Sequence, residues 1–375
     1  MSAHPLSGIR IIEMASIGPV PFAGMLLADL GAEVVSVAGP APAGIGADLL
    51  SRGKRFVRVD AKADPGREVI TRLIAGADAV TEGFRPGVME RLGLGPKEML
   101  AANPKLVYCR MTGWGQDGPL AERAGHDINY VAMAGVLGSI GPVGAPPTVP
   151  LNLVGDFGGG GMLLVTGLLA ALLEARSGGA GQVIDVAMVD GALLLLTMVQ
   201  QMQATGAWSH PRGMNLLDGG APFYRSYACE GGGYLAVGAL EPKFFEKLLA
   251  VLGLSEEFSV EEQYDRRRWP EMAEVFSARI GSRSRAEWEE AFLGVDACTT
   301  PVLDLAELPG HPLHRERGSF VEVDGTLQPR PAPRFTREAP KLRGAKPDTA
   351  AILREVGYSE AEIAGLVAAG AVIAE

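Results

Sequence analysis

The N-terminal segment constrains the fold most, because it predicts a strand, a helix and a second strand in close succession. Residues 10–14 (RIIEM) and 33–37 (EVVSV) are rich in Ile and Val and predict buried strands, and residues 17–30 between them predict a helix that ends at Gly31. A connection of this kind joins parallel strands with a right-handed crossover. The chain is therefore predicted to be α/β, with a large doubly wound (Rossmann-like) parallel sheet.

The rest of the chain predicts a second, smaller α+β domain. Further strands are predicted at 78–81, 106–111 and 182–187, and helices at 157–174 and 188–205. A hairpin at 224–237 and helices at 269–280 and 286–293 would form the smaller unit, which has an ordinary size for a domain. The predicted divisions are 1–205 for the large domain, 206–224 for a linker, 225–297 for the small domain, 298–340 for a return linker and 341–375 for C-terminal helices of the large domain.

Composition and charge exclude several classes of protein. A net charge of −10 argues against nucleic acid as the main partner, because phosphate binding needs a surplus of Lys and Arg. Cys109, Cys229 and Cys298 lack the paired spacing of zinc or redox motifs, which favours a reducing, cytoplasmic location and no metal. No secretory leader is expected, and the apolar run 162–173 is too short to span a bilayer, so no membrane is predicted.

The first turn is not a dinucleotide motif. Residues 16–19 (SIGP) lack the closely spaced glycines that approach a pyrophosphate, and no acidic residue ends the second strand. A nicotinamide enzyme is therefore not favoured.

Two short motifs suggest acid/base chemistry. Residues 125–127 (GHD) and 155–161 (GDFGGGG) each set an ionisable side chain, His126 or Asp156, just ahead of an apolar helix. A helix start offers unpaired N–H groups and a positive dipole end, so an acid placed there can be held and tuned. Two such groups in one cleft are suited to moving a carbon-bound proton. Helix capping is the alternative reading, and on the local pattern alone it is favoured for Asp156.

Residues 124–130 (AGHDINY) and 150–160 (PLNLVGDFGGG) resemble the active-site signature of the α-methylacyl-CoA racemases, within the family III CoA-transferase superfamily. The resemblance continues through 82–94 (EGFRPGVMERLGL). It implies interconversion of (R)- and (S)-2-methylacyl-CoA by 1,1-proton transfer through an enolate, with coenzyme A as part of the substrate and no separate cofactor. It also implies an interlocked homodimer.

The resemblance assigns roles to individual residues. His126 and Asp156 would be the acid/base pair, and Glu241 would orient the histidine. Independently of the resemblance, backbone N–H groups at the start of the helix after His126, including that of Asp127, could donate to the enolate oxygen. Residues implied to contact the coenzyme are Arg52, Lys54, Arg55, Val59, Lys62, Gly83, Phe84, Arg85, Arg91, Gly125 and Tyr130. One departure is Ala38, which stands where the racemases carry an arginine. Either Arg52, Lys54, Arg55 and Arg58 anchor the phosphates instead, or the nucleotide end binds more weakly.

Two other functions stay open at this point. In family III CoA-transferases an aspartate at the position of Asp127 is a nucleophile that forms an acyl anhydride, and this residue is present here. The fold could also bind acyl-CoA without catalysis, as a carrier or sensor. The combination of His126, Asp156 and Glu241 favours racemisation, because neither alternative needs it.

Overall fold

The computed structural model describes residues 4–39, 47–208, 210–336 and 342–373, and it divides into two units. Unit 1 comprises Met1–Ala134, Leu151–Leu195 and Arg317–Glu375, and unit 2 comprises Gly135–Pro150 and Leu196–Glu316. Residues 135–150, which were predicted to belong to the large domain, thus group with the smaller unit. Each unit is described by itself.

Unit 1 alternates strands and helices along the chain. Its strands are β1 (Arg10–Met14), β2 (Glu33–Ala38), β3 (Arg55–Val59), β4 (Ala79–Glu82), β5 (Val107–Thr112), β6 (Gln182–Ala187), β10 (Phe320–Val323), β11 (Thr326–Pro329), β12 (Lys346–Pro347) and β13 (Val372–Ile373). Its helices are α1 (Pro19–Asp29), α2 (Ala47–Leu50), α3 (Asp64–Ala75), α4 (Val88–Arg91), α5 (Pro96–Ala102), α6 (Asp127–Met133), η1 (Leu153–Met162), α8 (Leu163–Arg176), α9 (Met188–Leu195), α15 (Thr349–Glu355) and α16 (Glu360–Ala368).

The large sheet is the centre of unit 1. Its strand order is β12-β3-β2-β1-β4-β5-β6, with β13 added to β3, and every pair except β13–β3 is parallel. Ile11 and Ile12 of β1 are adjacent and both fully buried, and because a strand sends successive side chains to opposite faces, both faces of the sheet are covered. The predicted α/β class with a large, doubly wound parallel sheet is confirmed.

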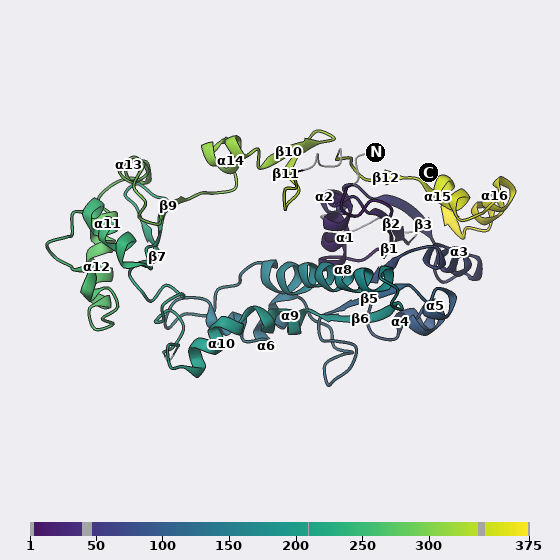
Figure 1. The fold of residues 1–375 in the computed structure, drawn as a ribbon, viewed down its shortest axis with the longest axis horizontal. Coiled ribbons are helices and arrows are strands. Elements are labelled where there is room, and N and C mark those ends of the chain that lie inside the picture. The colour runs from purple at the N-terminus through teal and green to yellow at the C-terminus, as the bar shows by residue number, and fades with distance from the viewer. Residues whose placement is uncertain (1–3, 40–46, 209, 337–341, 374–375) are drawn as a thin grey trace. The chain divides into compact units, whose positions relative to one another are not determined.

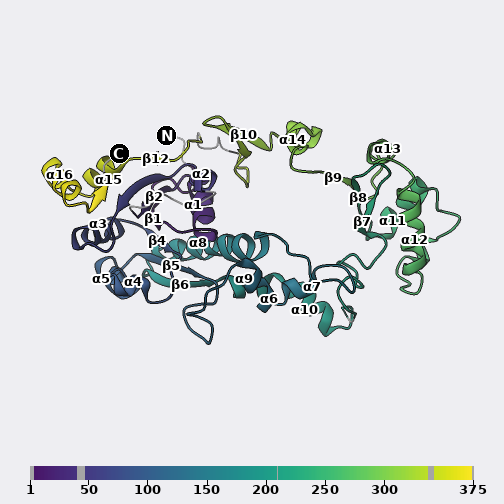
Figure 2. The same ribbon diagram turned by 180° about the vertical axis from the view of Figure 1, so that it is seen from behind.

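Each face of the sheet has its own hydrophobic core. Ile11 packs with residues of α1 and α8, such as Leu27 and Leu168. Ile12 packs with residues of α3 and α15, such as Ile70 and Ile352. Both views of the ribbon show α1 and α8 on one side of the strands and α3 and α5 on the other (Figure 1, Figure 2).

Unit 2 is built on a small antiparallel sheet. Its strands β7 (Tyr224–Ala228), β8 (Tyr234–Gly238) and β9 (Thr299–Val302) pair in that order. Its helices are α7 (Val136–Ser139), α10 (Thr197–Ala204), α11 (Pro242–Leu252), η2 (Val260–Glu262), α12 (Trp269–Ile280), α13 (Arg285–Ala291), η3 (Leu308–Gly310) and α14 (Pro312–Arg317). The core combines Tyr227 and Val237 from the sheet with Phe245, Phe276 and Trp288 from the helices.

Two helices differ from their predicted bounds. The helix predicted at 157–174 is part of a longer one, in which η1 is a π-helix that continues directly into α8. Together they run through Leu153–Arg176, which by length and composition alone is apolar enough to cross a membrane. Here the inner side of α8, including Leu164 and Leu172, is buried in the core of unit 1. The helix predicted at 188–205 is divided into α9 and α10.

Candidate active site

A cavity of about 540 Å³ lies in unit 1 at the carboxyl ends of the parallel strands. Ile17, which follows β1, Gly83, which follows β4, and Met111 near the end of β5 all line it. The strand order reverses between β1 and β4, where ligands bind in open α/β sheets. Of the residues predicted from sequence, the lining includes Gly83, Phe84, Arg85, Gly125, His126, Tyr130 and Asp156.

His126 is the N-cap residue of α6. The prediction that it lies just ahead of a helix is therefore confirmed. Its backbone N–H donates to Oδ1 of Asn129 at 3.1 Å, so the side chain of the third helical residue closes the helix start. The residue is exposed and lines the cavity, so its imidazole is accessible to a ligand there.

An aromatic pair supports the loop in front of His126. The rings of Trp114 and Tyr130 meet edge to face with their centroids 4.8 Å apart. The Tyr130 hydroxyl donates to the carbonyl of Gly125. A Cβ at Gly125 would lie 2.7 Å from the Tyr130 ring, so the close approach requires glycine. Tyr130 therefore presents its ring to the cavity, while its hydroxyl holds the loop.

Asp156 lies in the first turn of the π-helix η1, so the prediction that it precedes a helix is wrong. The glycines after it explain the position, because they let η1 lie against α1 and α9 at very short distances. A Cβ at Gly159 would be 2.6 Å from the backbone nitrogen of Ala192, and one at Gly161 would be 2.6 Å from the ring of Phe22. The glycine run is thus a packing surface within a helix.

The surroundings of Asp156 raise its pKa. Burial is the largest cause, because it penalises the charged carboxylate. A hydrogen bond from Nδ2 of Asn152, at 3.4 Å, and the nearby His126 lower the pKa, and the Asp127 carboxylate raises it. The net result is a carboxyl group that keeps its proton to a higher pH than an exposed aspartate does. His126 and Asp156 thus line one cavity and lie close enough to influence each other electrostatically.

Asp127 is the first residue of α6, and its side chain faces inward. It is buried, and its Oδ2 accepts the backbone N–H of Asp156 at 2.7 Å. The predicted nucleophile of a transferase therefore has one carboxylate oxygen engaged inside the protein.

Arg52 and Lys54, two of the predicted phosphate contacts, are buried in ion pairs with internal acids. Arg52 binds Asp29 through two hydrogen bonds, at 3.0 and 2.5 Å. Nζ of Lys54 donates to both carboxylate oxygens of Glu13, at 2.9 and 2.7 Å, and the Lys54 side chain is 1% exposed. Neither head group lines the cavity, so these two residues have a structural role here.

The other predicted coenzyme contacts divide into two groups. Arg55 is partly buried and pairs with Glu33, Asp348 and Glu355, and Val59 is buried in the sheet. The exposed basic residues among them are Lys62 in the turn after β3, Arg85 at the cavity and Arg91 at the end of α4, whereas Arg58 in β3 is partly buried.

Glu241 belongs to unit 2. It is the exposed N-cap residue of α11, and its carbonyl accepts the N–H groups of Phe244 and Phe245. The local sequence favoured this role for Glu241, an acidic residue at the start of a helix. The contact with His126 that the resemblance implies joins residues of two units, and it stays a prediction.

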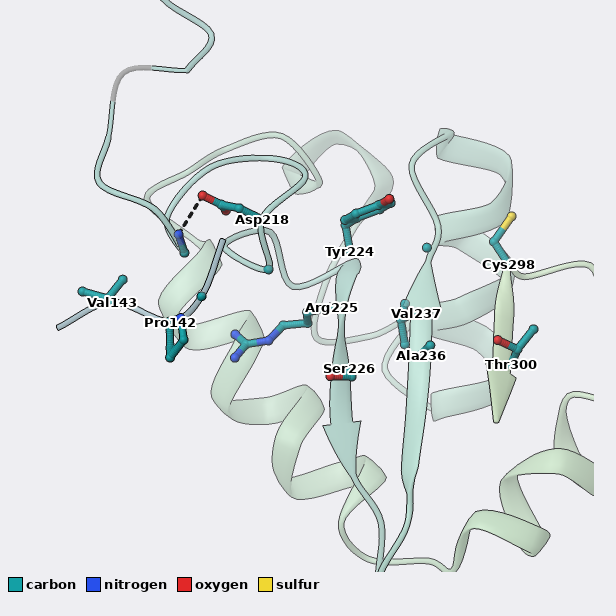
Figure 3. A pocket seen from close by; sticks show the side chains of 14 residues that line it. Pro142, Val143, Asp218, Tyr224, Arg225, Ser226, Ala236, Val237, Cys298 and Thr300 are labelled. Atoms are coloured by element: carbon teal, nitrogen blue, oxygen red, sulfur yellow. Dashed lines mark hydrogen bonds between the residues drawn. The ribbon is translucent and has the colours of Figure 1, made fainter. Parts of the chain in front are cut away.

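A second cavity, of about 770 Å³, lies within unit 2 and was missed from sequence (Figure 3). One wall is formed by residues on β7, β8 and β9, with Ser226 opposite Ala236 and Ala236 opposite Thr300 in the pairing register. Figure 3 shows the Arg225 side chain extending toward Pro142. The sequence predicted the hairpin at 224–237 but did not indicate that one face of its sheet lines a cavity.

Metal binding has no support in the part of the chain that the structure describes, where no group of three or more His, Cys, Asp or Glu side chains could hold an ion.

Comparison with known proteins places these features in a family context. Residues 6–351 match the model of CoA-transferase family III. The chain is 46% identical to α-methylacyl-CoA racemase of Mus musculus over 365 residues, which cover 96% of this chain and 95% of the relative. The human protein of the same name is 42% identical with the same coverage. These matches confirm the resemblance found in the sequence.

Relatives named as transferases and solved structures also match. Succinyl-CoA--D-citramalate CoA-transferase of Chloroflexus aurantiacus is 32% identical over 68% of this chain and 66% of the relative. The orthorhombic crystal structure of Rv3272 from M. tuberculosis has a TM-score of 0.76 and 28% identity, and covers 94% of this chain and all of that one. A CAIB/BAIF family protein from Brucella suis gives 0.77 and 26%, covering 94% and 99%.

Proposed function

Because the chain belongs to CoA-transferase family III, we propose that it is a racemase that interconverts (R)- and (S)-2-methylacyl-CoA thioesters. The mouse and human relatives at 46% and 42% identity carry this activity in their names. One observation of the site supports the proposal most: His126 and Asp156, two groups of different acid/base chemistry, line the same cavity.

The proposed reaction is a proton transfer at the α-carbon. His126 takes the α-proton from one face of the thioester. The thioester thereby becomes an enolate, whose negative charge lies mainly on the former carbonyl oxygen. The N–H of Asp127 has no partner inside α6 because it belongs to the first helical residue, so it can donate to that oxygen. Asp156 then delivers its proton to the opposite face of the α-carbon, and the reverse reaction exchanges the two roles.

The rate should depend on pH as a bell-shaped curve. In either direction the pair formed by His126 and Asp156 must hold one proton. Activity is therefore lost at low pH, where the pair binds a second proton, and at high pH, where it releases its only proton. The raised pKa of Asp156 suits this task, because it lets the carboxyl hold a proton at a higher pH than usual.

Coenzyme A would bind through exposed basic residues of unit 1. Arg85 lines the cavity, and Lys62 and Arg91 are exposed, so their head groups are accessible to phosphate. Arg52 and Lys54 are left out of this part of the proposal because internal carboxylates already bind them.

A test of the reaction uses no second carboxylic acid. In heavy water, the protein should introduce deuterium at the α-carbon of either enantiomer of a 2-methylacyl-CoA and bring both to the same mixture. The reason is that the abstracted proton is replaced from solvent-exchanged His126 or Asp156. Mass and chiral analysis of the recovered thioester measure both effects. No α-deuterium, together with CoA transfer only after a carboxylic acid is added, would contradict the proposal.

CoA transfer is a second candidate, supported by Asp127 and by the relatives named as transferases. It requires the Asp127 carboxylate to attack the thioester carbon. The burial of that carboxylate and its hydrogen bond to the N–H of Asp156 favour racemisation instead.

The proposal includes a homodimer, in which Glu241 of one copy orients His126 of the other. Supporting it, Leu193, Leu194 and Leu195 at the end of α9 are 45%, 61% and 56% exposed, and a row of apolar side chains is the kind of surface that subunits cover. Light scattering after gel filtration should therefore give twice the chain mass of 39.3 kDa. A monomer with full racemase activity would refute the shared site.

A further inference from the structure

The carboxylate of Asp127 connects the two segments that carry the acid/base groups. Asp127 directly follows His126 in the chain, and its Oδ2 accepts the backbone N–H of Asp156 at 2.7 Å. The hydrogen bond therefore joins the start of α6 to the first turn of η1, 29 positions along the chain. A change in the position of this one carboxylate would move both catalytic segments relative to each other.

The fit around this carboxylate is tight and specific. Asp127 is 6% exposed, and a Cβ on Gly155 would lie 2.5 Å from Oδ2, so only glycine at 155 leaves room for the hydrogen bond. The other oxygen, Oδ1, is buried and has no hydrogen-bond partner in the described part of the chain. One oxygen thus carries the contact to η1, while the other makes no hydrogen bond that a substitution would remove.

We propose that Asp127 is a positioning residue, whose side chain fixes Asp156 by accepting its backbone N–H, and that it is not a nucleophile. The inference rests on the proposed racemase function and deepens it. It gives Asp127 two separate parts: its backbone N–H holds the enolate oxygen, and its side chain sets the distance between the two groups that exchange the proton.

The first test compares Asp127→Asn with Asp127→Ala. Asparagine keeps an oxygen for the N–H of Asp156, and its nitrogen takes the place of the unpartnered Oδ1, so racemisation should stay within about tenfold of the wild type. Alanine removes the acceptor and should lower the rate by about 100-fold, the cost of misplacing a catalytic group by about 1 Å. An Asp127→Asn variant as inactive as Asp127→Ala, with its fold and acyl-CoA binding intact, would overturn the proposal, as would full activity in both.

A second variant reaches the same contact without changing Asp127. Gly155→Ala places a methyl carbon 2.5 Å from Oδ2, closer than a van der Waals contact, and should displace the carboxylate. Its rate should fall as far as that of Asp127→Ala. Normal racemisation in Gly155→Ala would contradict the positioning role, and this test stands even if Asp127→Ala does not fold.

The pH profile gives a readout that a general loss of structure would not produce. The charged groups that act on Asp156 are Asp127 and His126, and Asp156, Asp127 and Arg85 all act on the neighbouring Tyr130. Asp127→Asn removes a negative charge that favours protonation of Asp156, so the acid side of the bell should move to lower pH. The same acid limb in both proteins would speak against a close contact between the two carboxyl groups.

Hydrogen exchange tests the contact independently of activity. The peptide that contains the Asp156 amide should exchange faster in Asp127→Ala than in the wild type, and Asp127→Asn should keep it protected. If this holds while the wild type shows no α-proton exchange, the proposed function fails and the positioning role survives. If the wild type racemises and the amide is equally protected in all three proteins, the positioning role alone fails.

Discussion

His126→Ala is expected to slow the interconversion of the two enantiomers by about 10²–10⁴-fold, the range for a positioned general acid or base. The imidazole is exposed at the N-cap of α6, so its removal should leave the fold and acyl-CoA binding nearly unchanged. Asp156→Asn should cause a loss of similar size, because the amide cannot deliver a proton. Chiral chromatography of the product thioester over time measures both rates.

The two variants should fail in complementary ways. With His126 gone, Asp156 can still remove and return a proton on its own face, so deuterium should enter one enantiomer without inversion. Asp156→Asn should show the same behaviour for the opposite enantiomer. His210→Ala, which changes an exposed histidine of unit 2 outside this cavity, is the matched control and should keep the full rate. If both variants introduced deuterium into the same enantiomer, His126 and Asp156 would lie on the same face of the α-carbon. That result would refute the two-base mechanism.

The sheet could be predicted because its signals are local. The strands predicted at 10–14 and 182–187 correspond to β1 and β6 residue for residue, since both stretches carry β-branched residues, which signal a strand locally. The position of His126 at the start of a helix could also be predicted, because an N-cap depends on the residues immediately around it. Such features depend little on the rest of the fold.

Features that arise from tertiary contacts were not predictable from the same patterns. The π-helix η1 depends on α1 and α9 lying against Gly159 and Gly161, which the glycine run alone does not reveal. The division of the helix predicted at 188–205 occurs at Leu196, an apolar residue without helix-breaking chemistry. The carboxyl partner of Arg52 lies 23 positions away in sequence, so the basic residues at 52–62 suggested a phosphate site instead.

Lys54 and Arg85 were both predicted to hold coenzyme A, and their surroundings predict opposite results when they are changed. Lys54 is 1% exposed and Glu13 is 2% exposed, and their ion pair joins the residue just before β3 to β1. Lys54 also donates to the carbonyl of Pro21, so it fixes the start of α1, next to the cavity wall. Arg85 instead lines the cavity with an exposed side chain.

Lys54→Met is therefore expected to lower the free energy of unfolding by about 3–5 kcal/mol, because it leaves the Glu13 carboxylate buried without its cation. Urea unfolding measures the loss, and the double variant Lys54→Met with Glu13→Leu should recover most of it, since an apolar pair can replace a buried ion pair. Arg85→Ala should leave unfolding within about 0.5 kcal/mol of the wild type and raise the KM for acyl-CoA by about tenfold. If Lys54→Met were fully stable and raised KM instead, Lys54 would be a ligand contact, and the buried pair with Glu13 could not be its resting state. The location of a cation relative to the sheet, more than its place in a basic motif, thus decides whether it serves the fold or the substrate.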